Sequence, residues 1–356
     1  MNPAFSVRFR PTGPWRIGPD SGARDRTDSI YHSDTLFSAV TQAMASLGGL
    51  EEWLDATARS GEEPAVRFSS CFPFLDDVNF VVPPRSAWPP APSAKVRWSS
   101  ARFVPLAVVA ALLAEHTLDD EAWRVDGPSG CLLPAEGPYT SGPFRTSLRA
   151  HAAVDRVRGS GVEVHRTACL EFAPGAGLWA LASFADAEAE ARWKEPVKAA
   201  LRLLADTGMG GERSLGWGRS AAPEFIEGVL PDIVLPAVIP PAPADTAPEG
   251  EAPARSAPET AWWLLSMFSP GPQDAVDWQR GSYSIANRGG RVESPARSGD
   301  PKKPLPMVEE GSVLVAQAPP RGAAPDVAPD GFPHPVLRAG FALAIPVPLR
   351  QPGGAV

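Results

Sequence analysis

A glycine-rich segment at residues 207–220 carries the residue types that contact phosphate-bearing ligands. Five glycines fall within eleven positions, and Arg213, Trp217 and Arg219 stand among or directly beside them. Glycine lets a ligand approach the backbone closely, and successive backbone N–H groups in such a loop can form an anion-binding nest. Arginine adds bidentate phosphate contacts, and tryptophan offers a face on which a base stacks. The segment therefore predicts contact with a nucleotide or a phosphate-bearing polymer; a glycine-rich turn without a ligand is the alternative.

Two common nucleotide-binding motifs do not fit this segment. A Walker A loop places lysine directly after its second glycine, but Trp217 follows Gly216 here. A dinucleotide fingerprint begins as Gly208 and Gly210 do, but Arg213 occupies the position of the third glycine. Apolar spacing predicts a helix before the segment and a short strand after it. This order is the reverse of both nucleotide folds.

A cluster of arginines between residues 141 and 166 is a second candidate for binding. Its members are Arg145, Arg149, Arg156 and Arg158. They alternate with small polar residues, which suits a groove that tracks a nucleic-acid backbone; a solvated surface is the alternative. Basic groups also exceed acidic groups at 85–102 and 288–303, although the formal net charge of the chain is −8. Because fields act within a Debye length of about 8 Å, the acidic total does not exclude a nucleic-acid partner.

Two further groups could indicate catalysis. His32, Ser33 and Asp34 are consecutive, but Ser33 is a good N-cap, and we expect Ser33 and Asp34 to cap a helix. His151 and His165 flank the basic segment, and a ribonuclease would use a histidine as general acid or base. Polar surface is the simpler interpretation of both histidines. Because the sequence contains no Ser-His-Asp, His-Glu-x-x-His or paired-carboxylate motif, we expect no enzymatic activity.

Composition limits the class and the compartment of the protein. The chain has 356 residues and is 44% hydrophobic, which is enough for two domains with cores of their own. It contains no apolar run of membrane-spanning length, and its first residues lack the apolar core of a signal peptide. The three cysteines are widely spaced and form no Cys-x-x-Cys pair. We therefore expect a cytoplasmic protein without disulfides, metal or cofactor.

Hydrophobic periodicity predicts the elements that position these residues. Strands are expected at 4–10, 65–72, 78–82, 163–172 and 178–184, the last two forming a hairpin, and again from Glu224; helices are expected from residue 33, at 105–115 and at 185–206. Residues 127–147 are rich in glycine and proline and are expected to be loop. Eight prolines between 231 and 258 indicate a linker. Strands are then expected at 261–268, 312–316 and 336–347.

The order of helix, Gly-Met-Gly-Gly-Glu-Arg-Ser-Leu-Gly-Trp-Gly-Arg and strand resembles the RAMP superfamily of CRISPR proteins. Other stretches resemble one branch of it, the fourth subunit of the type III-A (Csm) effector. These stretches are Ile-Tyr-His-Ser-Asp-Thr-Leu-Phe from residue 30, Ser-Ser-Cys-Phe-Pro-Phe from 69, Val-Pro-Pro-Arg from 82, His-Ala-Ala-Val-Asp-Arg-Val from 151, Cys-Leu-Glu-Phe-Ala-Pro-Gly-Ala-Gly-Leu-Trp from 169, Arg-Gly-Gly-Arg from 288 and His-Pro-Val-Leu-Arg-Ala-Gly from 334. The acidic balance and the long Pro/Ala-rich stretch depart from the family pattern.

This resemblance implies an α+β protein with two ferredoxin-like (RRM-like) domains. The domains would span 1–230, with the glycine-rich loop at 207–220, and 260–356, joined by a Pro/Ala-rich linker at 231–259. The protein would be a non-catalytic RNA-binding subunit that holds the 5′ tag of the guide RNA (crRNA). It would bridge the large polymerase/nuclease subunit to the filament of backbone RAMP subunits, with target RNA nearby and no contact with a membrane. The alternatives are a RAMP endoribonuclease that processes guide RNA and a protein-only scaffold.

The glycine-rich segment, the arginine cluster and the resemblance together give a set of expected RNA-binding residues. They are His32, Ser33, Arg145, Arg149, Arg156, Arg158, Gly208, Gly210, Gly211, Arg213, Ser214, Gly216, Trp217, Gly218, Arg219 and Arg288.

Overall fold

A computed structural model describes residues 2–19, 21–90, 97–154, 162–235, 260–294 and 296–349. The N-terminal part is built on an antiparallel sheet with the strand order β11-β1-β10-β3-β4-β5, and β2 pairs with β10 beside β3. The strands are β1 (Asn2–Phe9), β2 (Val66–Phe68), β3 (Phe72–Leu75), β4 (Val78–Val81), β5 (Val104–Pro105), β10 (Ala176–Phe184) and β11 (Glu224–Leu230). Every residue of β10 is buried, as expected for the strand at the centre of the sheet.

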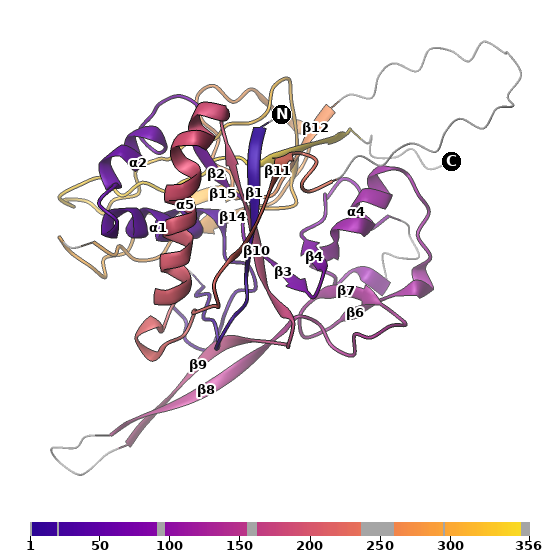
Figure 1. Cartoon of the computed structure of the whole chain (residues 1–356), viewed down its shortest axis with the longest axis horizontal. Coiled ribbons are helices and arrows are strands. Elements are labelled where there is room, and N and C mark those ends of the chain that lie inside the picture. The colour runs from indigo at the N-terminus through magenta and orange to yellow at the C-terminus, as the bar shows by residue number, and fades with distance from the viewer. Residues whose placement is uncertain are drawn as a thin grey trace, which may run out of the picture.

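Two long helices pack on each other beside this sheet (Figure 1). Helix α1 (Ser33–Ser46) buries Leu36, Val40 and Met44 at helical spacing, and α5 (Ala187–Thr207) begins at Asp186, whose side chain accepts a hydrogen bond from the Ala189 N–H. Helix α2 (Leu50–Ala56) follows α1, and α4 (Leu106–Leu113) lies at the other end of the sheet. The helices expected from 33, at 105–115 and at 185–206 are thus confirmed. Along the chain β1, α1, the β2/β3 pair, β10, α5 and β11 form a β-α-β-β-α-β series.

A two-stranded ribbon of β8 (Phe144–Val154) and β9 (Val162–Phe172) projects from the body of the molecule (Figure 1). The expected hairpin of 163–172 with 178–184 is wrong, because β9 pairs with β8 whereas β10 pairs with β1, β2 and β3. The prediction of loop at 127–147 is also wrong. Strand β7 (Cys131–Pro134) pairs there with β6 (Trp123–Asp126), and the glycines and prolines other than Pro134 lie between the strands.

The C-terminal part is made of strands. Its four-stranded sheet has the order β13-β16-β12-β17, and β14 pairs separately with β15. The strands are β12 (Thr260–Leu264), β13 (Val276–Ser282), β14 (Ile285–Arg288), β15 (Leu305–Val308), β16 (Val313–Ala316) and β17 (Ala344–Pro348). The strand expected at 336–347 begins only at Ala344. Residues 260–294 and 296–349 contain no helix, so the two helices that a second ferredoxin-like domain requires are not found among them.

The two parts share one continuous hydrophobic core. The same buried cluster contains Phe5 and Phe72 from the first sheet and Trp263 and Ile345 from the second. The indole N–H of Trp263 donates to the Val82 carbonyl at 3.2 Å, which ties the sheets together across this core. The predicted linker lies outside the described residues from 236 onward, and residues 231–235 form a turn that ends β11. Within the described ranges, no helix combines the length and the apolar character needed to cross a membrane.

Candidate nucleic-acid interface

The glycine-rich loop packs tightly on the segment that follows β1. The Gly211 N–H donates to the Arg16 carbonyl and the Gly218 N–H to the Pro14 carbonyl, both at 2.9 Å. Gly210 has a φ of +84°, and a Cβ at this position would overlap the Arg16 carbonyl oxygen. Gly216 also has a positive φ, of +80°, but open space surrounds its Cα. Part of the glycine content therefore serves backbone packing, whereas a Cβ at Gly216 would meet no other atom within 4 Å.

Trp217 is not the exposed stacking platform that the sequence predicts. Its side chain is 7% exposed, and its ring centroid lies 5.7 Å from that of His151 on β8. His151 in turn stacks on its cross-strand partner His165 with centroids 5.5 Å apart. The expectation failed because the β8–β9 ribbon, distant in the sequence, supplies the cover for this tryptophan.

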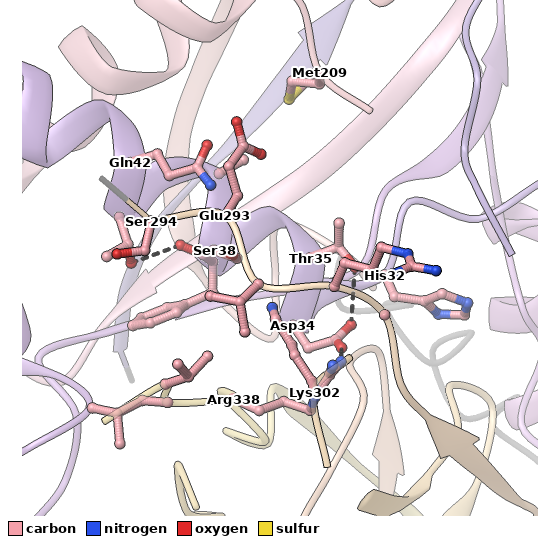
Figure 2. Close-up of a pocket in the computed structure, with 18 of the residues that line it drawn as sticks. His32, Asp34, Thr35, Ser38, Gln42, Met209, Glu293, Ser294, Lys302 and Arg338 are labelled. Atoms are coloured by element: carbon pink, nitrogen blue, oxygen red, sulfur yellow. Dashed lines mark hydrogen bonds and ion pairs between the residues drawn. The ribbon is translucent and has the colours of Figure 1, made fainter. Parts of the chain in front are cut away.

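A cavity of about 710 Å³ lies between α1, the glycine-rich loop and the C-terminal part (Figure 2). We call it the interdomain cavity. The loop contributes its backbone at 208–211 together with Arg213, and the C-terminal part contributes 288–294, Lys302 and 334–338. Six of the expected RNA-binding residues meet there: His32, Gly208, Gly210, Gly211, Arg213 and Arg288.

The other expected residues lie elsewhere. Arg145 and Arg149 are exposed on the β8–β9 ribbon, and both form ion pairs with Glu171. Hydrogen bonds from these two arginines lower the pKa of Glu171 below its usual value. Arg156 and Arg158 lie outside the described residues. Ser33, Ser214, Gly216, Trp217, Gly218 and Arg219 do not line the interdomain cavity.

Ser33 joins the two parts of the molecule, and the prediction that it caps α1 is wrong. His32 occupies the N-cap position, and no side chain caps the helix there. The Met267 N–H of the C-terminal part donates to Ser33 Oγ at 2.9 Å, and the Ser33 N–H donates to Ser70 Oγ at 2.8 Å. The Ser33 hydroxyl is thus committed to a partner 234 positions away.

His32 is a buried cation held between two carboxylates. Its Nδ1 lies 2.8 Å from Glu310 of the C-terminal part, and its Nε2 lies 3.2 Å from Asp28. Burial alone would lower the pKa of His32, but the Glu310 and Asp28 carboxylates outweigh it and raise the pKa to about 10. The imidazole is therefore charged at neutral pH, and it links the two parts electrostatically.

Asp34 is the centre of a second ionic link between the parts. Its carboxylate is fully buried and accepts hydrogen bonds from Arg288, with Nη2 to Oδ1 at 3.1 Å, and from Arg338. Burial alone would raise the pKa of Asp34, but Arg288 and Arg338 outweigh it and lower the pKa to about 2. Asp34 therefore serves as the buried counterion of two arginines, and the expected role as an N-cap is wrong. The guanidinium of Arg288 borders the interdomain cavity, but it is engaged by this carboxylate.

Several polar residues that line the cavity were not predicted. Thr35, Ser38 and Gln42 lie at positions i, i+3 and i+7 of α1, so they share one face of the helix. The sequence signal that could have identified them is their spacing, which places them on the face of α1 opposite its apolar stripe. Arg291 and Lys302 lie in the basic segment 288–303, which the sequence marks only as a region. The described residues contain no group of three or more His, Cys, Asp or Glu side chains that could hold a metal ion.

Comparison with known proteins finds a family that is similar to the C-terminal part. Residues 258–347 match the family described as "CRISPR Csm4 C-terminal domain". This segment is similar to the C-terminal domain of Csm4. The match supports a Csm4-type RAMP subunit, as the sequence resemblance implies, and it includes most of the described C-terminal strands.

Solved structures share the fold of the whole chain. A chain of the Csm3-Csm4 subcomplex of the type III-A CRISPR-Cas interference complex superposes with a TM-score of 0.60 at 14% identity. Chains of the Csm1-Csm4 cassette in complex with cA4 and with pppApA give TM-scores of 0.54 and 0.53 at 18% and 19% identity. Each match covers 99% of this chain and 100% of the other. No curated protein matches the chain by sequence.

Proposed function

We propose that this protein is the Csm4 subunit of a type III-A CRISPR (Csm) ribonucleoprotein and binds the 5′ tag of the crRNA in the interdomain cavity. The family match at 258–347 supports the subunit assignment. The observation that supports the site is the charge of the cavity. Six of its lining residues are Arg or Lys and three are Asp or Glu, whereas the whole chain has a net charge of −8. The basic groups of an acidic protein are thus gathered in a cavity that residues 208–211 of the glycine-rich loop also line.

The groups that would contact phosphate lie at the edge of the cavity. Arg213 is 36% exposed and pairs with Glu293 at 2.7 Å, and both residues line the cavity. Arg291 and Lys302 approach from the C-terminal part. A single RNA strand would exchange such carboxylate partners for phosphates and release the counterions that its phosphates hold in solution. Exposed ion pairs like that of Arg213 contribute little to stability, so the exchange costs little.

The same proposal covers the partners and the organisation of the chain. The protein would join a Csm1-type polymerase/nuclease subunit to a Csm3-type backbone filament in the cytoplasm, near target RNA, without a cofactor or catalysis of its own. We propose the division 1–230, 231–259 and 260–356, which the match at 258–347 supports at its last boundary. The β-α-β-β-α-β series supports a ferredoxin-like N-terminal domain. The C-terminal domain is proposed as a strand-only unit.

Capture of the protein from its host, followed by sequencing of bound RNA and mapping of ultraviolet cross-links, tests the proposal. We expect RNAs with a shared 5′ end and cross-linked peptides from 208–213 and 288–302. The same capture is repeated with the Arg213→Gln, Arg291→Gln double variant, which should return less RNA than the wild-type protein. Bound RNA without a common 5′ end, or cross-links confined to other surfaces, would overturn the site. Recovery of partner subunits without any RNA would favour the protein-only scaffold.

The pairing of His151 with His165 is the observation that favours the ribonuclease alternative. Two imidazoles with ring centroids 5.5 Å apart are close enough to act on one phosphodiester as acid and base. Incubation of the purified protein with a crRNA precursor separates this alternative from the proposed function. We expect no cleavage by the wild-type protein, whereas cleavage that disappears in a His151→Ala, His165→Ala variant would establish the ribonuclease.

A further inference from the structure

We infer that Gln42 and Ser38 of α1 read one unpaired adenine of the bound RNA inside the interdomain cavity, an inference that rests on the proposed function. Both residues line the cavity. They lie one turn apart on α1, and their side chains share a face with Thr35. The opposite face of the helix carries the buried Leu36, Val40 and Met44, so the orientation of the polar face toward the cavity is fixed by the core.

The side chains of Ser38 and Gln42 differ from those of Thr35 and Thr41 on the same helix in having no hydrogen-bond partner within the described part of the chain. Thr35 accepts a hydrogen bond from Arg288 Nη2 at 3.1 Å. Thr41 donates to the Phe37 carbonyl and accepts from the Trp53 indole. Gln42 and Ser38 are partly buried, as these threonines are, yet their side chains make no such bond. Partly buried polar groups aimed into a cavity are free to pair with a ligand.

The chemistry of Gln42 selects the ligand. Its amide presents one acceptor oxygen and an NH₂ donor on one planar group. Adenine presents a neighbouring donor and acceptor that a glutamine amide pairs with in a bidentate manner. The hydroxyl of Ser38, one helical turn away, can donate or accept and so adapts to a second edge position. An unpaired base is required, because the major groove of an RNA duplex is too deep and narrow for side chains to reach this edge.

The surroundings of Gln42 suit a planar apolar ring. Met209, 1% exposed, and Leu204 also line the cavity, and Figure 2 shows Glu293 beside Gln42, with Met209 farther off at the top of the view. A thioether adapts its shape and makes favourable contacts with aromatic rings. Glu293 forms an ion pair with Arg213, so a group proposed to bind phosphate lies next to the proposed base site. A base on Gln42 and Met209 would leave its phosphate near Arg213.

Competition binding with a set of tag RNAs, each changed at one position, tests the inference on the full-length protein. The wild-type protein should prefer adenine at one tag position by about tenfold, the discrimination expected of one bidentate pair. Gln42→Leu should remove that preference and keep the dependence of affinity on salt. Gln42→Glu, which keeps the size of the side chain but replaces the donor with an acceptor, should also lose it. Gln279→Leu, an exposed glutamine on β13, is the matched control and should change neither property.

The outcomes separate this inference from the proposed function. Salt-dependent RNA binding with the adenine preference intact in both Gln42 variants would overturn the base-reading role and leave the proposed function standing. Absence of any RNA binding by the wild-type protein would overturn both. Thermal melts of each variant, matched to the wild-type melt, confirm that the lost preference does not come from unfolding.

Discussion

Replacing Asp34 with asparagine should destabilise the protein strongly, although the substituted side chain is buried and the surface is unchanged. The carboxylate is fully buried and is shared by Arg288 and Arg338, which are 10% and 6% exposed in their side chains. Asparagine keeps the size of the side chain but removes its charge, so two guanidiniums lose their counterion inside the molecule. Breaking a buried ion pair from one side costs about 3–5 kcal/mol. We expect the free energy of unfolding to fall by that amount.

Urea denaturation followed by tryptophan fluorescence measures this change, and Asp55→Asn is the matched control. Asp55 also pairs with an arginine, Arg59, at 3.3 Å, but its side chain is 68% exposed. Exposed pairs contribute about 0–1 kcal/mol, so the control should lose little. If Asp34→Asn lost no more than Asp55→Asn, the interpretation of Asp34 as the ionic link between the two parts would be refuted.

The remaining predictions concern pH, the edge of the cavity and the glycine-rich loop. Because the folded-state pKa of His32 is raised from 6.5 to about 10, its contribution to stability should be complete below pH 6.5 and lost as the pH rises through about 10. Urea midpoints measured across this range for the wild-type protein and for His32→Gln test this. The prediction is contradicted if the midpoints of the two proteins change with pH by the same amount. Glu293→Gln should tighten RNA binding by freeing Arg213, and filter binding that shows equal or weaker affinity would exclude this competition. Gly210→Ala should destabilise the fold by more than the roughly 1–3 kcal/mol typical of a strained φ, because its Cβ meets the Arg16 carbonyl. Gly216→Ala should destabilise the fold only by the strain of its positive φ. Similar melting temperatures for the two variants would contradict the packing described for the loop.

Local signals predicted local structure well. The spacing of Leu36, Val40 and Met44 predicted α1 correctly, and the pattern before the glycine-rich loop predicted α5, because each helix buries one stripe of its own sequence. The β8–β9 ribbon was missed in part for the opposite reason. It is largely exposed, and it pairs with itself rather than with the sheet, so its hydrophobic pattern is weak.

Residues whose role depends on distant partners could not be placed from the sequence. Ser33 has the local pattern of an N-cap, yet its hydroxyl serves Met267, and the carboxylate of Asp34 serves arginines more than 250 positions away. Trp217 was expected to be exposed because a loop with so many glycines offers it little core to enter; the ribbon covers it in space. Six of the sixteen expected site residues line the cavity, and four of the six belong to the glycine-rich loop, which forms one of its walls.

The dependence of RNA affinity on salt tests the central claim most directly. For the purified protein and a single-stranded 5′-tag RNA, each phosphate contact adds about 0.7 to the slope of log K against log salt. If the interdomain cavity holds the RNA, the Arg213→Gln, Arg291→Gln double variant should flatten the slope by roughly 1.4. Arg10→Gln with Arg192→Gln, which removes two exposed arginines that do not line the cavity, should leave it unchanged. An unchanged slope in the cavity variant would contradict the claim that RNA binds there.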